Sequence, residues 1–466
     1  MADNEIDSKF EPIKEKMEAE NLSTLAINNF KHYYSRLVKE GKRGGLIPDS
    51  DIEPVDEIPC FKDVKGHYDK IGRRAQAKTV MIKLNGGLGT SMGLDKAKSL
   101  LKVKNGYTFL DIIIKQAVRD DIPLILMNSF RTRKDCLPRL QQDQELETDV
   151  PFDFVQHKVP KILQDDLSPA TFPKNRAHEW CPPGHGDIYN ALLASGILDK
   201  LLDHNYEYAF VSNSDNLGGV VNNSILGYFS DNNLPFMMEV AKRTPDDKKG
   251  GHLAQTEDGQ LLLRELSQCP REDLDNFQNI KKYKYFNTNN LWINLKSLKK
   301  EIDLSNNGLT LPMICNEKHV NPRDPDSSKV YQLETAMGAA ISKFSASEAI
   351  LVPPARFIPV KKTKSLLKIR SDIYILTDDF QIIENPERKV NECNIELDPD
   401  YYKLIDDMEE RFPYGPPSLL HCKSFKVVGD VWFGKGVKVE GNVTIINSHA
   451  QQKIIENRIL RGSIKL

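Results

Sequence analysis

Residues 84–93 read LNGGLGTSMG and follow directly on an apolar segment, Thr79–Leu84, that is typical of a buried strand. Glycine at positions 86, 87, 89 and 93 permits positive φ angles and lets backbone N–H groups approach a phosphate closely. A strand that runs into such a loop predicts a phosphate-binding site, with Lys98 as its cation. A flexible turn without a ligand is the alternative interpretation.

The glycine spacing excludes two common phosphate-binding loops. A dinucleotide fingerprint requires GxGxxG, whereas Gly87, Gly89 and Gly93 give GxGxxxG, and no acidic residue ends a second strand in the position that holds a ribose. A P-loop requires Gly-Lys-Ser/Thr, but Gly93 precedes Leu94 and Asp95. The loop is therefore expected to bind phosphates by another scheme.

Strand-like and helix-like segments alternate after residue 79. The strand-like segments are Thr79–Leu84, Pro123–Met127, Tyr208–Ser212 and Phe236–Val240, and the helical patterns are Thr108–Arg119, Gly186–Leu198 and Val220–Phe229. This alternation predicts an α/β fold with a mixed, mostly parallel sheet that is covered on both faces. In such sheets ligands bind at the carboxyl ends of the strands.

The two ends of the chain differ from its middle in their residue patterns. Residues 10–40 have the apolar spacing of an amphipathic helical region, and residues 41–78 contain enough Gly and Pro to predict an irregular connector. We therefore expect an N-terminal helical region and connector over 1–78, a catalytic domain over 79–380, a linker or helical segment over 381–420 and a C-terminal domain over 421–466.

The C-terminal domain shows a six-residue period. One series is Phe425, Val431, Val437 and Val443, and a second, two positions later, is Val427, Phe433, Val439 and Ile445. A hexapeptide repeat of buried aliphatic residues predicts a parallel β-helix, with an antiparallel meander as the alternative. The exposed edge of such a coil makes it a possible surface for homo-oligomer formation.

Composition excludes several classes of protein. The 466 residues carry 64 Lys+Arg and 66 Asp+Glu, a net charge of −2, which predicts no nucleic-acid partner. No apolar run approaches the ~20 residues of a membrane span, and the acidic N-terminal residues do not resemble a secretory or transit signal. The seven cysteines form no CxxC motif, so a reduced, cytoplasmic location is expected.

A second motif, Ser212–Gly218, lies at the end of the predicted strand Tyr208–Ser212 and reads SNSDNLG. A carboxylate at a strand end, opposite a phosphate loop, is a suitable ligand for Mg²⁺, which prefers one or two carboxylates together with substrate phosphates. Asp215 is therefore the candidate metal ligand. The alternative is an Asn/Asp turn that caps the next helix.

Three further motifs contain candidate binding residues. In Trp180–Asp187, His185 could donate to a phosphate, or could be an exposed loop histidine. The asparagines of Phe286–Trp292 suit sugar hydroxyls, or a tight polar turn. In Arg356–Lys361, a proline-stiffened segment could carry Lys361 into the cleft, whereas Lys362 and Lys364 are expected to be solvated.

These motifs, in this order, resemble the eukaryotic UTP–glucose-1-phosphate uridylyltransferase (UDP-glucose pyrophosphorylase) family from about residue 25 to the C-terminus. The matching segments are Leu84–Gly93 with Lys98-Ser99, Leu126–Phe130, Trp180–Asp187, Ser212–Gly218, Lys249–Gly251, Phe286–Trp292, Gln332–Ile341 and Arg356–Lys361. The resemblance implies a Rossmann-like nucleotidyltransferase core and a C-terminal left-handed parallel β-helix. The chain departs from the usual family pattern at Cys181, Ser214, Lys96-Ala97 and Lys362.

The resemblance also implies roles for individual residues. It assigns Leu84, Asn85, Gly86, Gly87, Lys98, Gln156, Gly184, Asp215 and Lys361 to UTP. It assigns Gly86, Gly87, His185, Asn213, Ser214, Asp215, Gly250, Glu265 and Asn289 to the sugar phosphate. Lys361 and Lys98 would be the catalytic residues, and Asp215 would hold Mg²⁺.

The implied reaction joins UTP and glucose 1-phosphate to give UDP-glucose and pyrophosphate, reversibly. A pyrophosphorylase for UDP-N-acetylhexosamine or for a broader set of UDP-sugars would use the same residues and remains an alternative. A non-catalytic UDP-sugar sensor is a second alternative, although it would be expected to lose one of Lys98, Asp215 and Lys361, which are all present.

Overall fold

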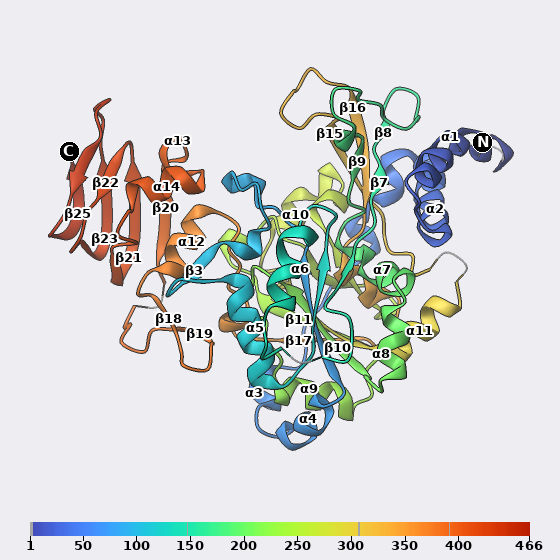
Figure 1. Cartoon of the computed structure of the whole chain (residues 1–466), viewed down its shortest axis with the longest axis horizontal. Coiled ribbons are helices and arrows are strands. Elements are labelled where there is room, and N and C mark those ends of the chain that lie inside the picture. The colour runs from blue at the N-terminus through green and yellow to red at the C-terminus, as the bar shows by residue number, and fades with distance from the viewer. Residues whose placement is uncertain (1–2, 147, 306–307, 391) are drawn as a thin grey trace.

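The computed structural model describes residues 3–146, 148–305, 308–390 and 392–466. Its largest sheet lies in the middle of the molecule (Figure 1). This sheet has the strand order β1-β12-β14-β10-β2-β5-β6, with β11 paired to β14 and β17, and β13 paired to β12. These strands are β1 (Glu53–Pro54), β2 (Thr79–Asn85), β5 (Leu124–Asn128), β6 (Asp153–Val155), β10 (Tyr208–Asn213), β11 (Phe236–Lys242), β12 (His252–Gln255), β13 (Leu261–Arg264), β14 (Tyr285–Asn294) and β17 (Glu348–Leu351).

The sheet is buried on both faces, as its apolar strands predict. In β2, Val80 and Ile82 point to one hydrophobic cluster and Met81, between them, points to another. Helices cover each face: α5 (Phe109–Asp120) and α9 (Asn223–Asp231) contribute to the Met81 cluster, and α7 (Ile188–Ala194), α8 (Ile197–Asp203) and α11 (Leu295–Asp303) to the other. The prediction of a doubly covered α/β sheet is confirmed.

The prediction that this sheet is mostly parallel is wrong for one half of it. Pairs β10–β2, β2–β5 and β5–β6 are parallel, as is β11–β17. The long strand β14, however, runs antiparallel to both β10 and β11, and β12 is antiparallel to each of its partners. Both strand types are apolar when buried on two faces, so local sequence does not distinguish them.

The predicted helices form with shifted or divided bounds. Thr108 accepts from the backbone N–H of Asp111, and the Asp111 carboxylate accepts from that of Thr108, so this capping box starts α5. The predicted helix Gly186–Leu198 is instead α7 and α8, because Gly196 adopts a positive φ of 72° between them. The remaining helices of the core are α6 (Arg133–Gln141), α10 (Leu274–Gln278) and α12 (Thr363–Arg370).

The N-terminal region forms two helices, α1 (Asp3–Ala19) and α2 (Thr24–Glu40), because Asn21 has a positive φ and Ser23 caps the second helix. They pack on β7 (Val159–Pro160), β9 (Trp180–Cys181) and the small sheet of β8 (Ile162–Leu163), β15 (Ile314–His319) and β16 (Lys329–Glu334), as Figure 1 shows. The connector is more ordered than predicted: it holds α3 (Phe61–Val64), α4 (Asp69–Gln76) and strand β1.

The C-terminal segment alternates between two parallel sheets at the far end of the molecule from the N-terminus (Figure 1). One sheet is β20 (Asn394–Leu397), β21 (Ser418–Val428), β23 (Lys438–Ile446) and β25 (Ile459–Lys465), and the other is β22 (Val431–Phe433) and β24 (Lys453–Ile455). All eight residues of the two hexapeptide series are buried. The parallel pairing confirms the repeat and excludes the antiparallel meander.

The C-terminal strands pack against the rest of the chain. Helices α13 (Pro399–Tyr402) and α14 (Ile405–Arg411) pack against β22, and one continuous hydrophobic cluster joins the coil to α5 and α12. Two short hairpins, β3 (Lys102–Lys104) with β4 (Tyr107–Thr108) and β18 (Tyr374–Leu376) with β19 (Ile382–Glu384), complete the fold. Among the described helices, none is long and apolar enough to cross a membrane.

Candidate active site

The carboxyl ends of β2 and β10 lie side by side, because Leu84 is in parallel register with Asn213. The glycine loop begins at the first of these ends and the Ser212–Gly218 motif at the second. Gly89 and Gly93 of the loop adopt positive φ angles of 68° and 78°, which other residues adopt only with strain. The loop turns back so that the Lys98 backbone N–H donates to the Gly87 carbonyl at 3.1 Å.

This turn brings two predicted residues into contact. The Lys98 ammonium donates to the Asp215 carboxylate at 2.6 Å, and the two side chains are 14% and 18% exposed. The pair is accessible to a ligand but shielded enough that its electrostatic interaction is stronger than in bulk water. The arrangement places one cation and one anion beside the glycine loop.

Lys361 reaches this area from another part of the chain. The backbone N–H of Val360 donates to the Asp215 carbonyl at 3.2 Å, and Pro359 forms an isolated bridge with Asn216. The Val360 side chain is buried, whereas Lys361 is exposed, with its ammonium 6.0 Å from the Phe357 ring centre. The backbone contact therefore fixes the position of the Lys361 backbone, while its side chain stays free to meet a substrate.

Glu265 lies close to Lys361 and to the glycine pair Gly250-Gly251. A Cβ at Gly251 would lie 2.6 Å from the Glu265 carboxylate carbon, so the close approach requires glycine there. Burial raises the pKa of Glu265, and the positive charge of Lys361 acts in the opposite direction. Glu265 is half-buried, and a carboxylate of this kind can accept hydrogen bonds from sugar hydroxyls. Gly250 itself packs against Phe286.

His185 is held in one tautomer. The Met337 backbone N–H donates to His185 Nδ1 at 2.9 Å, so Nδ1 carries no proton. Burial lowers the pKa of His185 to about 4, which keeps the ring neutral near pH 7. The remaining proton is therefore on Nε2, and His185 is a neutral hydrogen-bond donor. It can donate to a phosphate without adding charge.

The loop that carries His185 is packed closely against the segment after β16. The Gly186 N–H donates to the Thr335 carbonyl at 2.9 Å, and the Thr335 N–H donates to the Pro183 carbonyl at 2.9 Å. A Cβ at Gly184 would lie 2.3 Å from the Thr335 carbonyl oxygen. Gly184 has a φ of 82°, so both its conformation and its neighbour require glycine.

Asn289 lies in a bulge of β14. The register between β11 and β14 shifts after Glu239, which pairs with Asn290, to Val240, which pairs with Asn287. Asn289 has a positive φ of 61°, and its side-chain oxygen accepts from Asn287 Nδ2 at 2.8 Å. The bulge places the half-buried Asn289 amide near the carboxyl end of β10, because Leu291 pairs with Val211.

Two predicted nucleotide residues differ in their exposure. Asn85 is buried, and its amide donates to Asn128 Oδ1 at 2.7 Å, so its side chain braces β2 against β5. Gln156, just after β6, is half-buried, and a Cβ at Gly86 would lie 2.9 Å from its amide nitrogen. Gly86 and Gln156 therefore face each other, whereas Asn85 can offer a ligand its backbone but not a free amide.

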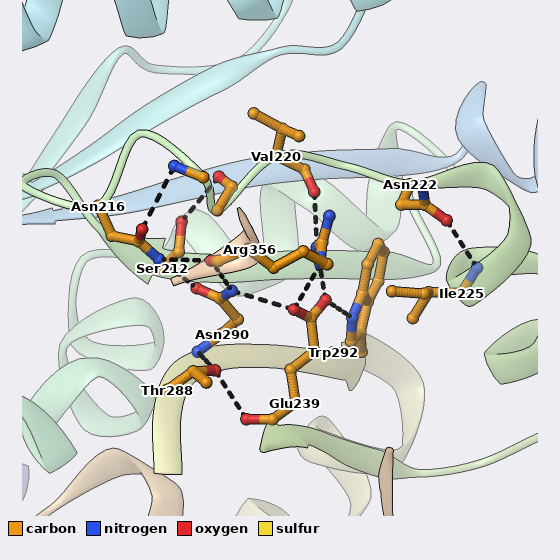
Figure 2. Close-up of polar contacts among 12 residues, drawn as sticks. Ser212, Asn216, Val220, Asn222, Ile225, Glu239, Thr288, Asn290, Trp292 and Arg356 are labelled. Carbon is orange, nitrogen blue, oxygen red and sulfur yellow. Dashed lines mark hydrogen bonds and ion pairs between the residues drawn. The ribbon is translucent and has the colours of Figure 1, made fainter. Parts of the chain in front are cut away.

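A buried polar network lies beneath these residues (Figure 2). Glu239 accepts from Arg356 Nε at 2.7 Å and Nη2 at 2.5 Å, and also from Asn290 and Trp292. Asn216 donates to the Arg356 carbonyl at 3.1 Å and accepts from the Ile358 N–H at 2.9 Å. The network fixes the segment that ends in Lys361 against the turn that carries Asp215.

The donors present would suit a magnesium ion shared with a substrate. No group of three or more His, Cys, Asp or Glu side chains that could hold a metal occurs among the described residues. Asp215 presents a carboxylate, partly accessible, beside the glycine loop. Mg²⁺ commonly keeps several waters and binds one or two carboxylates plus phosphates, so the residues fit such an ion once phosphates are present.

Several residues of this region escaped the sequence analysis. Glu239 and Lys83 lie within otherwise apolar strands, so the strand pattern gave no sign that they have a role of their own. Lys83 is fully buried, and its ammonium donates to the Ser212 hydroxyl at 2.7 Å. Asp187 accepts from the His157 backbone N–H at 2.6 Å and from its ring at 2.8 Å. Thr335 lies in the matching segment Gln332–Ile341, but the sequence analysis gave it no role. The remaining predicted residues, Leu84 and Ser214, lie at the joined ends of β2 and β10.

Comparison with known proteins agrees with this geometry. The family model described as UTP–glucose-1-phosphate uridylyltransferase matches residues 27–440. The chain belongs to this family. A UTP–glucose-1-phosphate uridylyltransferase of Solanum tuberosum is 41% identical over 409 residues, which cover 86% of this chain and 81% of the relative.

Solved structures of the family extend the likeness to the whole fold. A mutant UDP-glucose pyrophosphorylase of Leishmania major, in complex with UDP-glucose, matches with a TM-score of 0.90 and 41% identity, covering 98% of this chain and 99% of that chain. The UDP-glucose phosphorylase of Trypanosoma brucei matches with a TM-score of 0.88 and 44% identity, covering 98% and 100%.

Proposed function

We propose that this site transfers the uridylyl group of UTP to glucose 1-phosphate, giving UDP-glucose and pyrophosphate in a reversible reaction. The observation that supports this most is the meeting of three elements: the glycine loop, the Lys98–Asp215 pair and the segment that carries Lys361. Membership of the family and the UDP-glucose bound to the Leishmania major structure support the same reaction.

The chemistry requires charge neutralisation more than proton transfer. The attacking group is a phosphate oxygen of glucose 1-phosphate, which is already ionised near pH 7, so no general base is needed. It forms a bond to the α-phosphorus of UTP as the bond to the bridging oxygen breaks. Lys98 and Lys361 would offset the negative charge on the phosphates as that exchange proceeds.

A magnesium ion bound by Asp215 and the phosphates would neutralise further charge at the α-phosphate. Because the Lys98 ammonium donates to one oxygen of Asp215, binding of the phosphates would shift that ammonium group from the carboxylate toward a phosphate. The negative charge of the Asp215 carboxylate would then be compensated by the magnesium ion in place of the Lys98 ammonium.

The remaining predicted residues would hold the two substrates. Gln156, opposite Gly86, would bind the uracil together with Gly184. Leu84, Asn85, Gly86 and Gly87 would bind UTP. His185 would donate from Nε2 to the sugar phosphate, and Glu265 would accept from a sugar hydroxyl. Asn289, Gly250, Asn213 and Ser214 would complete the sugar-phosphate site around Gly86, Gly87 and Asp215.

A substrate panel tests this assignment. Pyrophosphate release from UTP should be fastest with glucose 1-phosphate among several sugar 1-phosphates. Preference for N-acetylglucosamine 1-phosphate would favour the UDP-N-acetylhexosamine alternative, and comparable rates with many sugars would favour a broad UDP-sugar enzyme. Tight UDP-glucose binding without turnover would indicate a sensor.

Five finer features belong to the same proposal. We infer that the core is Rossmann-like, that the C-terminal coil is a left-handed β-helix, and that the chain divides at residues 78, 380 and 420. A cytoplasmic location is in keeping with the free thiols of all seven cysteines, each of which lies within the described residues. Homo-oligomers through the coil are supported by the exposed Ile454 and Ile459 near its edge.

A further inference from the structure

Asp187 lies directly before α7, where an aspartate usually caps its own helix, but its carboxylate bonds elsewhere. Among the described residues of α7, no backbone N–H donates to this side chain. Instead, Oδ2 accepts from the His157 backbone N–H at 2.6 Å and Oδ1 from His157 Nδ1 at 2.8 Å. Both oxygens of a buried carboxylate are therefore committed to one residue, 30 positions earlier in the chain.

The residue that Asp187 holds, His157, directly follows Gln156. The N–H that donates to Oδ2 belongs to the peptide group between Gln156 and His157, and the Gln156 N–H donates to the Asn128 carbonyl at 2.8 Å. Gln156 is thus held by β5 on one side and by Asp187 on the other. Its amide, which faces Gly86, bonds to none of the residues that the structure describes. The position of that amide consequently depends on these two backbone hydrogen bonds.

The space behind the His157–Asp187 pair is loosely packed. A cavity of about 20 Å³ borders both residues, which is room for about one water molecule. It is also lined by Ala26, Phe30 and Tyr33 of α2 and by Val159, Pro183 and Thr335. Side chains next to a cavity lack contact atoms on that side and are less confined than those in a close-packed core. The hydrogen bonds between the two residues are therefore the main restraint on their position.

We propose that Asp187 and His157 are positioning residues for base recognition: they hold the Gln156 amide where it favours uracil over cytosine. The inference rests on the proposed function, in which Gln156 binds the uracil. Uracil presents an N3–H donor and an O4 acceptor, whereas cytosine presents an N3 acceptor and an amino donor. A glutamine amide offers both a donor and an acceptor, so a mobile Gln156 could adapt to either base. A Gln156 with a fixed backbone has less freedom to do so.

Loss of the Asp187 carboxylate should therefore weaken the discrimination between bases. In Asp187→Ala, we expect the ratio of kcat/KM for UTP to kcat/KM for CTP to fall by about 10-fold. Both rates come from the same folded molecules, so a smaller amount of active protein does not change this ratio. In His157→Ala the backbone N–H still donates to Asp187, and the ratio should fall by about threefold at most.

The conservative variant separates position from charge. In Asp187→Asn, the side-chain oxygen can still accept from the His157 N–H, and its NH₂ group can donate to His157 Nδ1 once the ring proton lies on Nε2. The ratio should therefore stay within about twofold of the wild-type value. Asp187→Leu, of similar shape but without an acceptor, replaces the alanine variant if Asp187→Ala does not fold.

Asp372→Ala is the matched control. Asp372 is also a half-buried carboxylate that accepts from a backbone N–H, that of Leu419, at 2.7 Å, but it lies after α12, against β21. Its loss should lower stability and leave the UTP/CTP ratio unchanged. An unchanged ratio in Asp187→Ala, an equal fall in Asp372→Ala, or a fall in Asp187→Asn as large as that in Asp187→Ala would overturn the positioning role.

Direct binding distinguishes this inference from the proposed function. In calorimetric titrations the wild type should bind UDP more tightly than CDP, and Asp187→Ala should lose about 10-fold of that preference. If the wild type fails to turn over UTP but this loss is found, the positioning role stands and the proposed function fails. If turnover is normal and the preference is the same in both proteins, the positioning role is wrong and the proposed function stands. Equal binding of UDP and CDP by the wild type would also overturn the positioning role.

Discussion

Lys98 and Asp215 are 117 positions apart in the sequence, yet the Lys98 ammonium donates to the Asp215 carboxylate at 2.6 Å. The contact joins the loop after β2 to the turn after β10, whose strands run in parallel register. Each of the two charges is thereby compensated by the other. The pair also defines where phosphates and an accompanying cation would meet.

Asp215→Asn should leave the fold intact and reduce turnover by roughly 10²–10³, because an amide cannot neutralise a cation near the α-phosphate. Initial rates over a magnesium titration measure this, with Asp199→Asn, an exposed carboxylate on α8, as the control. Wild-type rates at ordinary magnesium concentrations would rule out Asp215 as the metal ligand.

Lys361→Ala should lower kcat and kcat/KM together by roughly 10²–10³, since its charge matters most when negative charge builds in the transition state. Lys362→Ala is the matched neighbour: this residue is exposed and precedes α12 without a side-chain capping bond. Its removal should change rates by less than about threefold. Damage at Lys362 with no effect at Lys361 would mean that the wrong lysine had been assigned.

Glu239→Gln should destabilise the protein by about 3–5 kcal/mol, because it leaves the buried Arg356 guanidinium without its partner. Rates should fall as well, since Arg356 anchors the segment that carries Lys361 (Figure 2). Urea unfolding and initial rates measure the two effects. The double variant Glu239→Leu/Arg356→Met should lose less stability than the sum of the single variants. Additive losses would show that the pair does not act as a unit.

The His157–Asp187 pair predicts a pH-dependent stability. Burial acts to lower the pKa of His157, but the Asp187 carboxylate outweighs it and raises the pKa above its usual value. A raised folded-state pKa stabilises the protein fully below the unfolded value, about 6.5, and this contribution is lost as pH rises through the folded value.

The difference in unfolding free energy between the wild type and Asp187→Asn should therefore be largest near pH 5.5 and smaller above the folded-state pKa of His157. Chemical unfolding across this range gives the difference directly. A difference that grows with rising pH would show that the pair does not bind a proton as described.

Local sequence was sufficient for the features that depend on local pattern. The six-residue repeat predicted which residues of the coil are buried. The four glycines predicted a loop in which positive φ is permitted, and two of them, Gly89 and Gly93, adopt it. The end of an apolar strand was enough to single out Asp215. These features follow from periodicity and backbone freedom, which each segment carries by itself.

Long-range pairing could not be predicted in the same way. Nothing in β14 alone indicates that it runs antiparallel between β10 and β11. The Glu239–Arg356 pair joins residues that are 117 positions apart, and Arg323 reaches the glycine loop only through the fold of its hairpin. Such contacts depend on tertiary structure, so single-sequence patterns leave them open.

The most direct test of the central claim is the rate of pyrophosphate formation from UTP and glucose 1-phosphate by the purified chain, compared with Lys98→Ala under saturating magnesium. The account predicts rapid UDP-glucose synthesis by the wild type and a loss of roughly 10²–10³ in the variant. Absence of synthesis by the folded wild type, or full activity without Lys98, would contradict it.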